Sequence, residues 1–200
     1  MSTSKNFKRA LLALSVALPL ASAGAGAAVI DFEGQGTPHQ YNDLDKPIDG
    51  FVFNYTMDNF DLADSPWSGD NGGAHSGQFA AVNNYQGNGE LSLANGYQFD
   101  FSEMYVKTWD QLSGQHFTVS GWLNGVQVGA SSIVAGPSWT RIGGNFGKID
   151  KLVFGGFDSF VVDDIVVTAS AVPEPQTYAL LLAGLGLLGA AARRRSGVAR

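Results

Sequence analysis

The sequence predicts an all-β protein whose body is an antiparallel β-sandwich. Between residues 28 and 173, no stretch of 11 or more residues shows apolar residues at the helical period. Short runs rich in Val, Ile, Phe and Tyr occur instead, separated by Gly, Asn, Asp and Pro. Of the 26 glycines, 20 lie in this body, as many tight turns require. About eleven short strands in a body of this length are typical of a sandwich.

The expected strands follow one another at 29–33, 51–55, 78–82, 90–94, 97–101, 104–109, 115–123, 126–134, 139–142, 151–154 and 159–168. The clearest turn is Asn124-Gly125, because this pair favours a two-residue hairpin in which both residues have positive φ. We expect the first and last strands to be neighbours. The expected core residues are Phe117, Val119, Val126, Val128, Val153, Phe160, Val162, Ile165 and Val167.

The first 27 residues have the layout of a secretory signal peptide. Lys5, Lys8 and Arg9 precede an apolar stretch at 10–20, and small residues follow up to Ala27. The apolar stretch is shorter than the ~20 residues that span a bilayer. We therefore expect cleavage near Ala27; the alternative is an N-terminal core helix, which the Ala/Gly run would end poorly.

The C-terminal segment combines three features in order: a Pro-Glu-Pro motif, an apolar run and an arginine cluster. The residues are Val172, Pro173, Glu174 and Pro175, then 178–192, then Arg193, Arg194 and Arg195. This layout resembles the PEP-CTERM sorting signal; the alternative is a generic C-terminal anchor. We accordingly divide the chain into a signal peptide at 1–27, a sandwich at 28–171 and a sorting signal at 172–196, with a transmembrane helix at 178–192.

The PEP-CTERM resemblance implies a destination. Such signals are recognised and cleaved by an exosortase-type membrane transpeptidase in Gram-negative bacteria that make exopolysaccharide. The expected path is export through the inner membrane, transient anchoring by the C-terminal helix, and release to the cell surface or extracellular matrix. The arginine cluster would stay on the cytoplasmic side.

The charge of the body excludes one class of partner. Residues 28–173 carry 5 basic and 17 acidic side chains, a net charge of −12. Nucleic-acid binding requires clustered Lys and Arg, so we expect no nucleic-acid partner. The chain has no cysteine, which excludes disulfides and thiolate metal sites. An acidic body is compatible with neutral glycans and with hard cations such as calcium.

The two ends of the body resemble the jelly-roll domains of PEP-CTERM proteins and carbohydrate-binding modules. The resemblance rests on residues 30–34 (IDFEG) and 160–165 (FVVDDI). It implies a structural Ca²⁺ shared by Glu33 and Asp164, with Asp31 and Asp163 as neighbours. Asp163 and Asp164 interrupt an apolar strand, so one of them faces inward or lies at an edge. The alternative to calcium is a β-bulge, or an edge kept polar against aggregation.

Aromatic residues in polar surroundings are the candidate glycan contacts, because a flat ring packs on the apolar face of a sugar while polar groups bond its hydroxyls. Trp67 lies in an acidic segment at 58–77, for which we expect a solvated loop; the alternative is a second cation site or a ligand-contacting loop. Trp109 ends a strand, and Tyr85 is a possible helper. Trp122 and Trp139 are expected to pack in the core or a hairpin.

Catalytic motifs are not found in the sequence. The three histidines show no H-E-x-x-H pattern, and there is no G-x-S-x-G motif. We therefore expect a non-catalytic module that associates with glycan or is structural. Two alternatives remain open: a secreted polysaccharide-active enzyme using a carboxylate pair, and an adhesive protein without a specific ligand.

Overall fold

The computed structural model describes residues 27–63, 72–170 and 180–188. The chain divides into two units: one compact unit spans Gly24–Val172, and the other comprises Met1–Ala23 and Pro173–Arg200. Residues 180–188 of the second unit are helical. Among the described residues, no helix is long and apolar enough to cross a membrane. The predicted signal sequence up to residue 26 and the sorting residues 172–175 and 193–195 lie outside the described residues.

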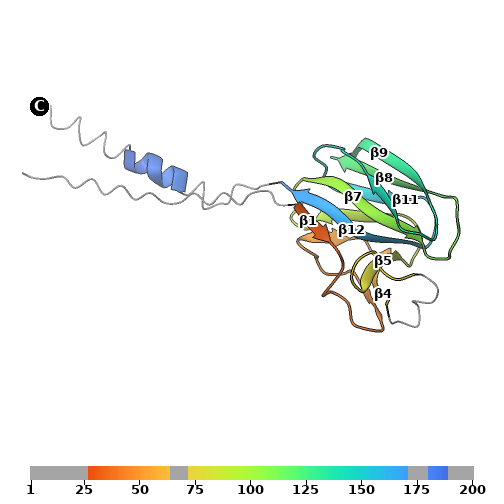
Figure 1. The fold of residues 1–200 in the computed structure, drawn as a ribbon. Helices are drawn as coiled ribbons and strands as arrows, with labels where there is room; N and C mark the ends of the chain where they lie inside the picture. The colour runs from red at the N-terminus through yellow and green to blue at the C-terminus, as the bar shows by residue number, and fades with distance from the viewer. Residues whose placement is uncertain (1–26, 64–71, 171–179, 189–200) are drawn as a thin grey trace, which may run out of the picture. The chain divides into compact units, whose positions relative to one another are not determined.

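The unit Gly24–Val172 is a sandwich of two antiparallel sheets (Figure 1). The first sheet has the order β10-β7-β12-β5-β4-β2, with β1 also paired to β12. Its strands are β1 (Ala27–Ile30), β2 (Tyr41–Asp43), β4 (Met57–Asp61), β5 (Phe79–Asn83), β7 (Phe99–Thr108), β10 (Thr140–Gly143) and β12 (Phe160–Ala169). The second sheet has the order β3-β6-β11-β8-β9. Its strands are β3 (Phe51–Phe53), β6 (Gly89–Leu93), β8 (Gln115–Leu123), β9 (Val126–Ala135) and β11 (Lys151–Gly155).

The predicted sandwich is confirmed, and so is the pairing of its first and last strands, since Ile30 pairs with Ile165. The Asn124-Gly125 hairpin is confirmed as well: Asn124 has φ 51° and Gly125 has φ 77°. The stretches expected at 97–101 and 104–109 form a single strand, β7.

Two strands of the first sheet, β2 and β4, are absent from the prediction. The expectation of a solvated loop from residue 58 onward is wrong for Asp58 and Asp61, which lie in β4 and are 1% and 0% exposed. Asn59 in the same strand donates from its Nδ2 to the carbonyl of Phe32. Asp61 accepts the N–H of His39 at 2.7 Å. These polar side chains hold the segment before β2 against the sheet by hydrogen bonds. Because polar residues occupy these positions, β4 shows no hydrophobic alternation in the sequence.

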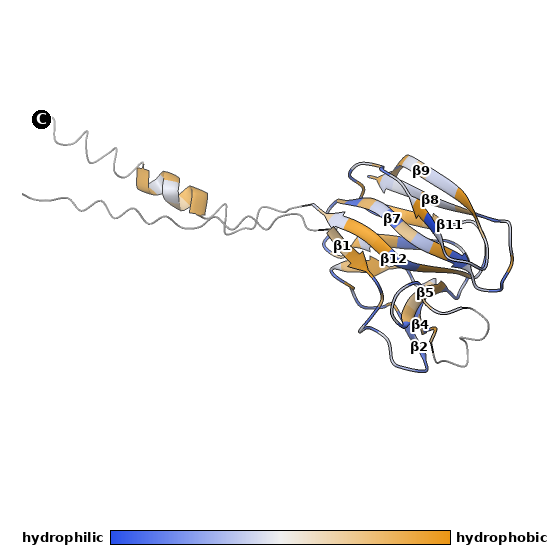
Figure 2. Cartoon of the chain, in the orientation of Figure 1, coloured by the Kyte–Doolittle hydropathy of each residue, from blue (hydrophilic) through white to orange (hydrophobic). Residues whose placement is uncertain are grey.

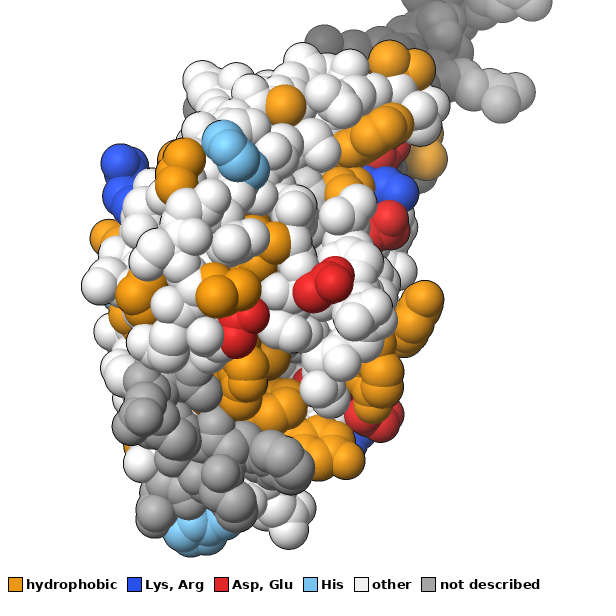
Figure 3. Space-filling model, turned by 90° about the vertical axis from the view of Figure 1, so that its right-hand side faces the viewer, with side chains coloured by type: hydrophobic (Ala, Val, Ile, Leu, Met, Phe, Trp, Pro, Cys, Tyr) orange, Lys and Arg blue, Asp and Glu red, His pale blue; other side chains and the backbone are white. Residues whose placement is uncertain are grey.

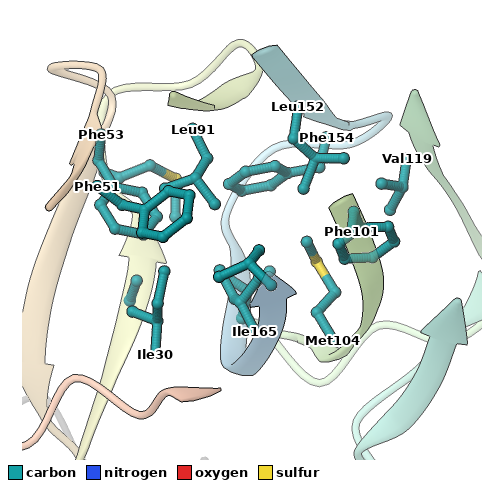
Figure 4. Close-up of a cluster of buried hydrophobic side chains, with 14 of the residues drawn as sticks. Ile30, Phe51, Phe53, Leu91, Phe101, Met104, Val119, Leu152, Phe154 and Ile165 are labelled. Atoms are coloured by element: carbon teal, nitrogen blue, oxygen red, sulfur yellow. The ribbon is translucent and has the colours of Figure 1, made fainter. Parts of the chain in front are cut away.

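The main core lies between the two sheets and takes its residues from Ile30 through Val167. Figure 4 shows Ile30, Phe101, Met104 and Ile165 of the first sheet pointing toward side chains of the second, among them Phe51, Leu91, Val119 and Phe154. The ribbon of β12 is mostly hydrophobic in colour, as expected for a strand in the middle of its sheet (Figure 2). Because this core is made within one unit, we expect residues 24–172 to fold on their own.

Six of the predicted core residues are buried: Phe117, Val119, Phe160, Val162, Ile165 and Val167. The prediction is wrong for Val126 and Val128, which are 64% and 44% exposed because they lie on β9 at the edge of its sheet. Val153 is only partly buried, since it lies between two inward-facing residues of β11 and therefore on the opposite face.

A second hydrophobic cluster covers the outer face of the seven-stranded sheet. Its buried members are Phe60, Leu62, Ala80, Val82 and Val161, with Ala74, Trp109 and Trp139 packed against them. A solvated sheet face is ordinarily polar. This cluster therefore makes the outer face of the first sheet the candidate location of a functional site.

Candidate functional site

Three carboxylates, Glu33, Asp163 and Asp164, lie where β12 changes its pairing partner, and we call them the acidic seam. On one edge β12 pairs with β5 through Val161 and Val162, and with β1 from Ile165 onward. Between these stretches the register with β7 shifts, and Asp164 has φ 47°. The β-bulge that the sequence left open as an alternative is therefore present at Asp163 and Asp164.

The carboxylates at this seam hold the segment that leads into β5. The Oε1 atom of Glu33, just after β1, accepts the N–H groups of Gln78 at 2.7 Å and Phe79 at 2.8 Å. The Oδ2 atom of Asp163 accepts the N–H groups of His75 and Ser76 at 2.8 and 3.1 Å.

Asp164 completes these contacts with the side chains of the same segment. Its two oxygens lie 2.6 Å from His75 Nδ1 and 2.7 Å from Ser76 Oγ. Glu33, Asp163 and Asp164 therefore all bind residues 75–79, which closes the gap between β1 and β5.

These contacts bear on the predicted calcium site. Asp163 already accepts three N–H groups, since its Oδ1 also bonds the N–H of Asp164. Asp31 accepts the N–H of Glu33 within its own turn. Across the parts of the chain that the structure describes, no group of three or more His, Cys, Asp or Glu is arranged to hold a metal ion. In this arrangement the carboxylates accept N–H and O–H groups, and the calcium site stays a prediction.

Burial changes the titration of two charged groups on this face. Desolvation raises the pKa of Asp163 to about 7, against its N–H bonds, which favour the charged form. Desolvation likewise lowers the pKa of Lys107 to about 8, partly offset by the nearby charge of Asp163. The Lys107 ammonium donates to the carbonyl of Gly73 at 2.6 Å and lies 4.6 Å from the centre of the Trp139 ring. Both groups therefore also fix the segment over this face.

An aromatic pocket opens on the same sheet face, nearer to β2. It is lined by Tyr41, Phe60, Val82, Asn83, Asn84, Trp109 and Ser159 and has a volume of about 320 Å³. The Tyr41 and Phe60 rings stack with centroids 5.4 Å apart and planes at 22°. The Trp109 ring meets Phe60 edge-on, also at 5.4 Å. Tyr41 is 46% exposed and Trp109 partly exposed, so both rings present surface to solvent.

Polar groups surround these rings and are held in place. Asn84 donates from its Nδ2 to Asp58 Oδ2 at 2.7 Å, and the backbone N–H of Trp109 donates to the backbone carbonyl of Ser159 at 2.8 Å. Burial raises the pKa of Asp58, while the Asn84 bond opposes that shift. Tyr85 lies outside this pocket and lines two neighbouring hollows with Asp43 and Asp45. The arrangement offers flat apolar faces beside amide, hydroxyl and carboxyl groups.

A second aromatic group lies toward β10 on the same sheet. The His75 ring stacks on Tyr105 with centroids 3.5 Å apart and planes at 17°. It meets Trp139 edge-on at 5.7 Å. The indole Nε1 of Trp139 is buried without a hydrogen-bond partner among the described atoms. His75 thus connects the seam acids to this group.

The structure sorts the predicted glycan contacts into three cases. Trp109 lies in the aromatic pocket, Tyr85 lies beside it and is 54% exposed, and Trp67 lies outside the described residues. Sequence reasoning missed Tyr41 and Phe60, which belong to the two unpredicted strands. The strand that carries Tyr41 is the run Tyr41-Asn42-Asp43, and three residues are too few to show the alternation that indicates a strand.

Comparison with known proteins identifies similar folds and one sequence motif. No curated protein matches the chain in sequence. Among solved structures, TmCBM61 in complex with β-1,4-galactotriose is similar at 11% identity and a TM-score of 0.39, over 64% of this chain and 92% of that one. CBM29-2, a family 29 carbohydrate-binding module in mutant form, matches at 10% identity and a TM-score of 0.41, over 73% and 92%.

A third similar structure is the MgGH51 α-L-arabinofuranosidase with bound arabinose, at 13% identity and a TM-score of 0.42. That match covers 73% of this chain but only 27% of the enzyme. The sequence motif is more specific, because residues 171–195 match the model of the PEP-CTERM protein-sorting motif. The resemblance drawn from the Pro-Glu-Pro sequence is thereby confirmed: the chain carries a PEP-CTERM sorting motif at its C-terminal end.

Proposed function

We propose that this protein is exported, processed by an exosortase-type enzyme, and placed at the cell surface or in the extracellular matrix. There its sandwich acts as a non-catalytic module that associates with glycan. The sorting motif at 171–195 supports the destination. The aromatic pocket on the outer face of the seven-stranded sheet is the observation that carries the glycan-binding part of the proposal.

The pocket fits the chemistry of a sugar ring. A pyranose has an apolar C–H face, which packs on an aromatic ring, and a rim of hydroxyls, which require hydrogen-bonding partners. Tyr41 and Trp109 supply exposed rings, and Asn84 and Ser159 supply polar groups in the same pocket. Asp58 fixes the Asn84 amide, so the polar wall is ordered before a ligand arrives.

Charge indicates which glycans this face accepts. The body has a net charge of −12, and Asp43, Asp45 and Asp58 line the hollow next to the pocket. Figure 3 shows one face of the body, on which acidic side chains lie among hydrophobic ones while Lys and Arg lie toward the margins. A polyuronate would be repelled by such a surface. We therefore propose neutral glycans as the ligand class.

The proposal is tested by binding the body, residues 24–172, to a panel of neutral and acidic polysaccharides. Tyr41→Ala removes an exposed ring, and we expect it to weaken binding of the best neutral glycan about tenfold, the loss of one stacking contact. Trp109→Phe should have a smaller effect. The matched control is Trp122→Ala, which removes a partly exposed ring from the other sheet and should leave binding unchanged.

Three outcomes would overturn this account. Equal binding by the Tyr41 and Trp122 variants would exclude the pocket. Release of reducing ends from the bound glycan would indicate the alternative, a polysaccharide-active enzyme. Absence of binding across the whole panel by a folded body would favour an adhesive protein without a specific glycan ligand.

A further inference from the structure

The second sheet ends in a long, uncharged edge strand. β9 (Val126–Ala135) has 10 residues, lies at the end of the strand order, and is visible at the outer margin of the sandwich in Figure 1. The other strands that end a sheet order are shorter: β2 and β3 have 3 residues each and β10 has 4. β9 contains no Asp, Glu, Lys, Arg or Pro. These are the residues with which proteins ordinarily protect an edge from pairing.

One protective device is present, but it covers only part of the strand. The register between β8 and β9 shifts between Gly121 and Trp122, which places a bulge close to the hairpin. From Gly129 to Ala135 the pairing with β8 is regular. In the described part of the chain, β9 makes its backbone hydrogen bonds to β8, and directly after it the carbonyl of Gly136 accepts the N–H of Thr108. The outer edge of this stretch is therefore free to accept another strand.

The side chains beside this edge are small or apolar and face solvent. Val128 and Val134 are 44% and 57% exposed, and Ala130 and Ser132 between them are exposed as well. The rest of the body is strongly acidic, with a net charge of −12. Two copies of such a body repel each other, and a contact through an uncharged strand adds the least to that repulsion. β9 provides that contact.

We propose that the β9 edge pairs with the β9 edge of a second copy of this chain. Antiparallel pairing about a twofold axis brings the same strand to itself, so one surface serves both partners. The backbone groups of both edges are then satisfied, and the two five-stranded sheets become continuous across the pair. A single strand pair buries less than the ~1,200 Å² of a standard stable interface, so the association is weak and depends on concentration.

The test is sedimentation equilibrium of residues 24–172 over a wide range of protein concentration. This unit lacks residues 173–200, so association through the C-terminal segment is excluded. We expect the weight-average mass to rise from that of a monomer toward that of a dimer. Ser132→Lys combined with Val134→Lys places like charges on both paired strands and should raise the dissociation constant at least tenfold.

A matched control and a second readout complete the experiment. Val29→Lys changes a valine of similar exposure, 49%, on β1, and should leave dimerisation unaltered. In the wild type, amide hydrogen exchange in residues 129–135 should slow as protein concentration rises, while exchange in β3 should not. A body that stays monomeric at every concentration would overturn the proposal, and so would a dimer that withstands the double lysine variant.

Discussion

The two outer faces of the sandwich differ in chemistry. On the five-stranded sheet the outer face is polar around β11: Lys151 pairs with Glu90 at 3.3 Å and lies 6.0 Å from the centre of the Trp122 ring. The Trp122 indole N–H donates to Ser120 Oγ. Polar side chains of this kind are solvated and need no other part of the chain packed over them.

On the seven-stranded sheet the outer face is a second hydrophobic cluster with Phe60 and Val161 at its centre. Part of it is covered by the segment before β5, and part is left open as the aromatic pocket. Among the described residues, the buried hydrophobic cluster on an outer face belongs to the seven-stranded sheet. We therefore place function on that face, and four measurements test whether the two faces differ in this way.

The largest expected effect concerns a carboxylate on each face. The pKa of Asp163 is about 7 in the folded protein, above its ordinary value of 3.8, because the group is buried. The folded state then binds this proton more readily than the unfolded state, so stability falls as pH rises from about 4 to about 7. Asp163→Asn removes this dependence. Relative to the variant, the wild type should lose roughly 2–4 kcal/mol of unfolding free energy across that window.

The matched change on the other face is Glu90→Gln, which removes an exposed ion pair. We expect it to change stability by less than ~1 kcal/mol at any pH in the same range. Urea unfolding at pH 4 and pH 7.5 measures both differences. If the Asp163→Asn difference is the same at the two pH values, Asp163 is not desolvated as described.

The next effect compares two identical truncations. Val161→Ala removes two methyl groups from the second cluster, where Val161 is 0% exposed. We expect a loss of about 2 kcal/mol, from transfer of the methyl groups and the space they leave. Val153→Ala lies on the outer face of the other sheet and should cost less than ~1 kcal/mol. Equal costs in denaturant unfolding would show that the two faces are equally buried.

The fold and the site differ in how far the sequence could predict them. The Asn124-Gly125 hairpin and β8 follow from local chemistry, since the turn requires positive φ at both residues and the strand is long enough to show its alternation. β4 could not be recognised, because Asn59 and Asp61 face the turns they hold rather than following a hydrophobic pattern. The pocket depends on Tyr41 and Phe60, which lie in the two strands that the sequence did not predict. Of its aromatic residues, Trp109 was therefore the one that the sequence analysis identified.

The smallest expected effect concerns calcium. Sequence reasoning allowed a Ca²⁺ site at Glu33 and Asp164, whereas in the structure these carboxylates bond N–H and O–H groups of residues 75–79. We expect a chelator to shift the Tm of the body by less than about 2 °C, which corresponds to under ~1 kcal/mol. A larger fall that added Ca²⁺ reverses would establish the cation site and would mean that the segment rearranges around it.

The aromatic pocket is the central feature of the proposed function, and the indole N–H resonances of the tryptophans report on it directly. The body is titrated with the neutral glycan that binds best, and the four indole signals are followed by NMR. We predict that the Trp109 signal moves with saturable dependence on glycan concentration, while the Trp122 signal on the opposite sheet stays in place. A Trp122 signal that moves while Trp109 does not would contradict the assignment of the site to the seven-stranded sheet.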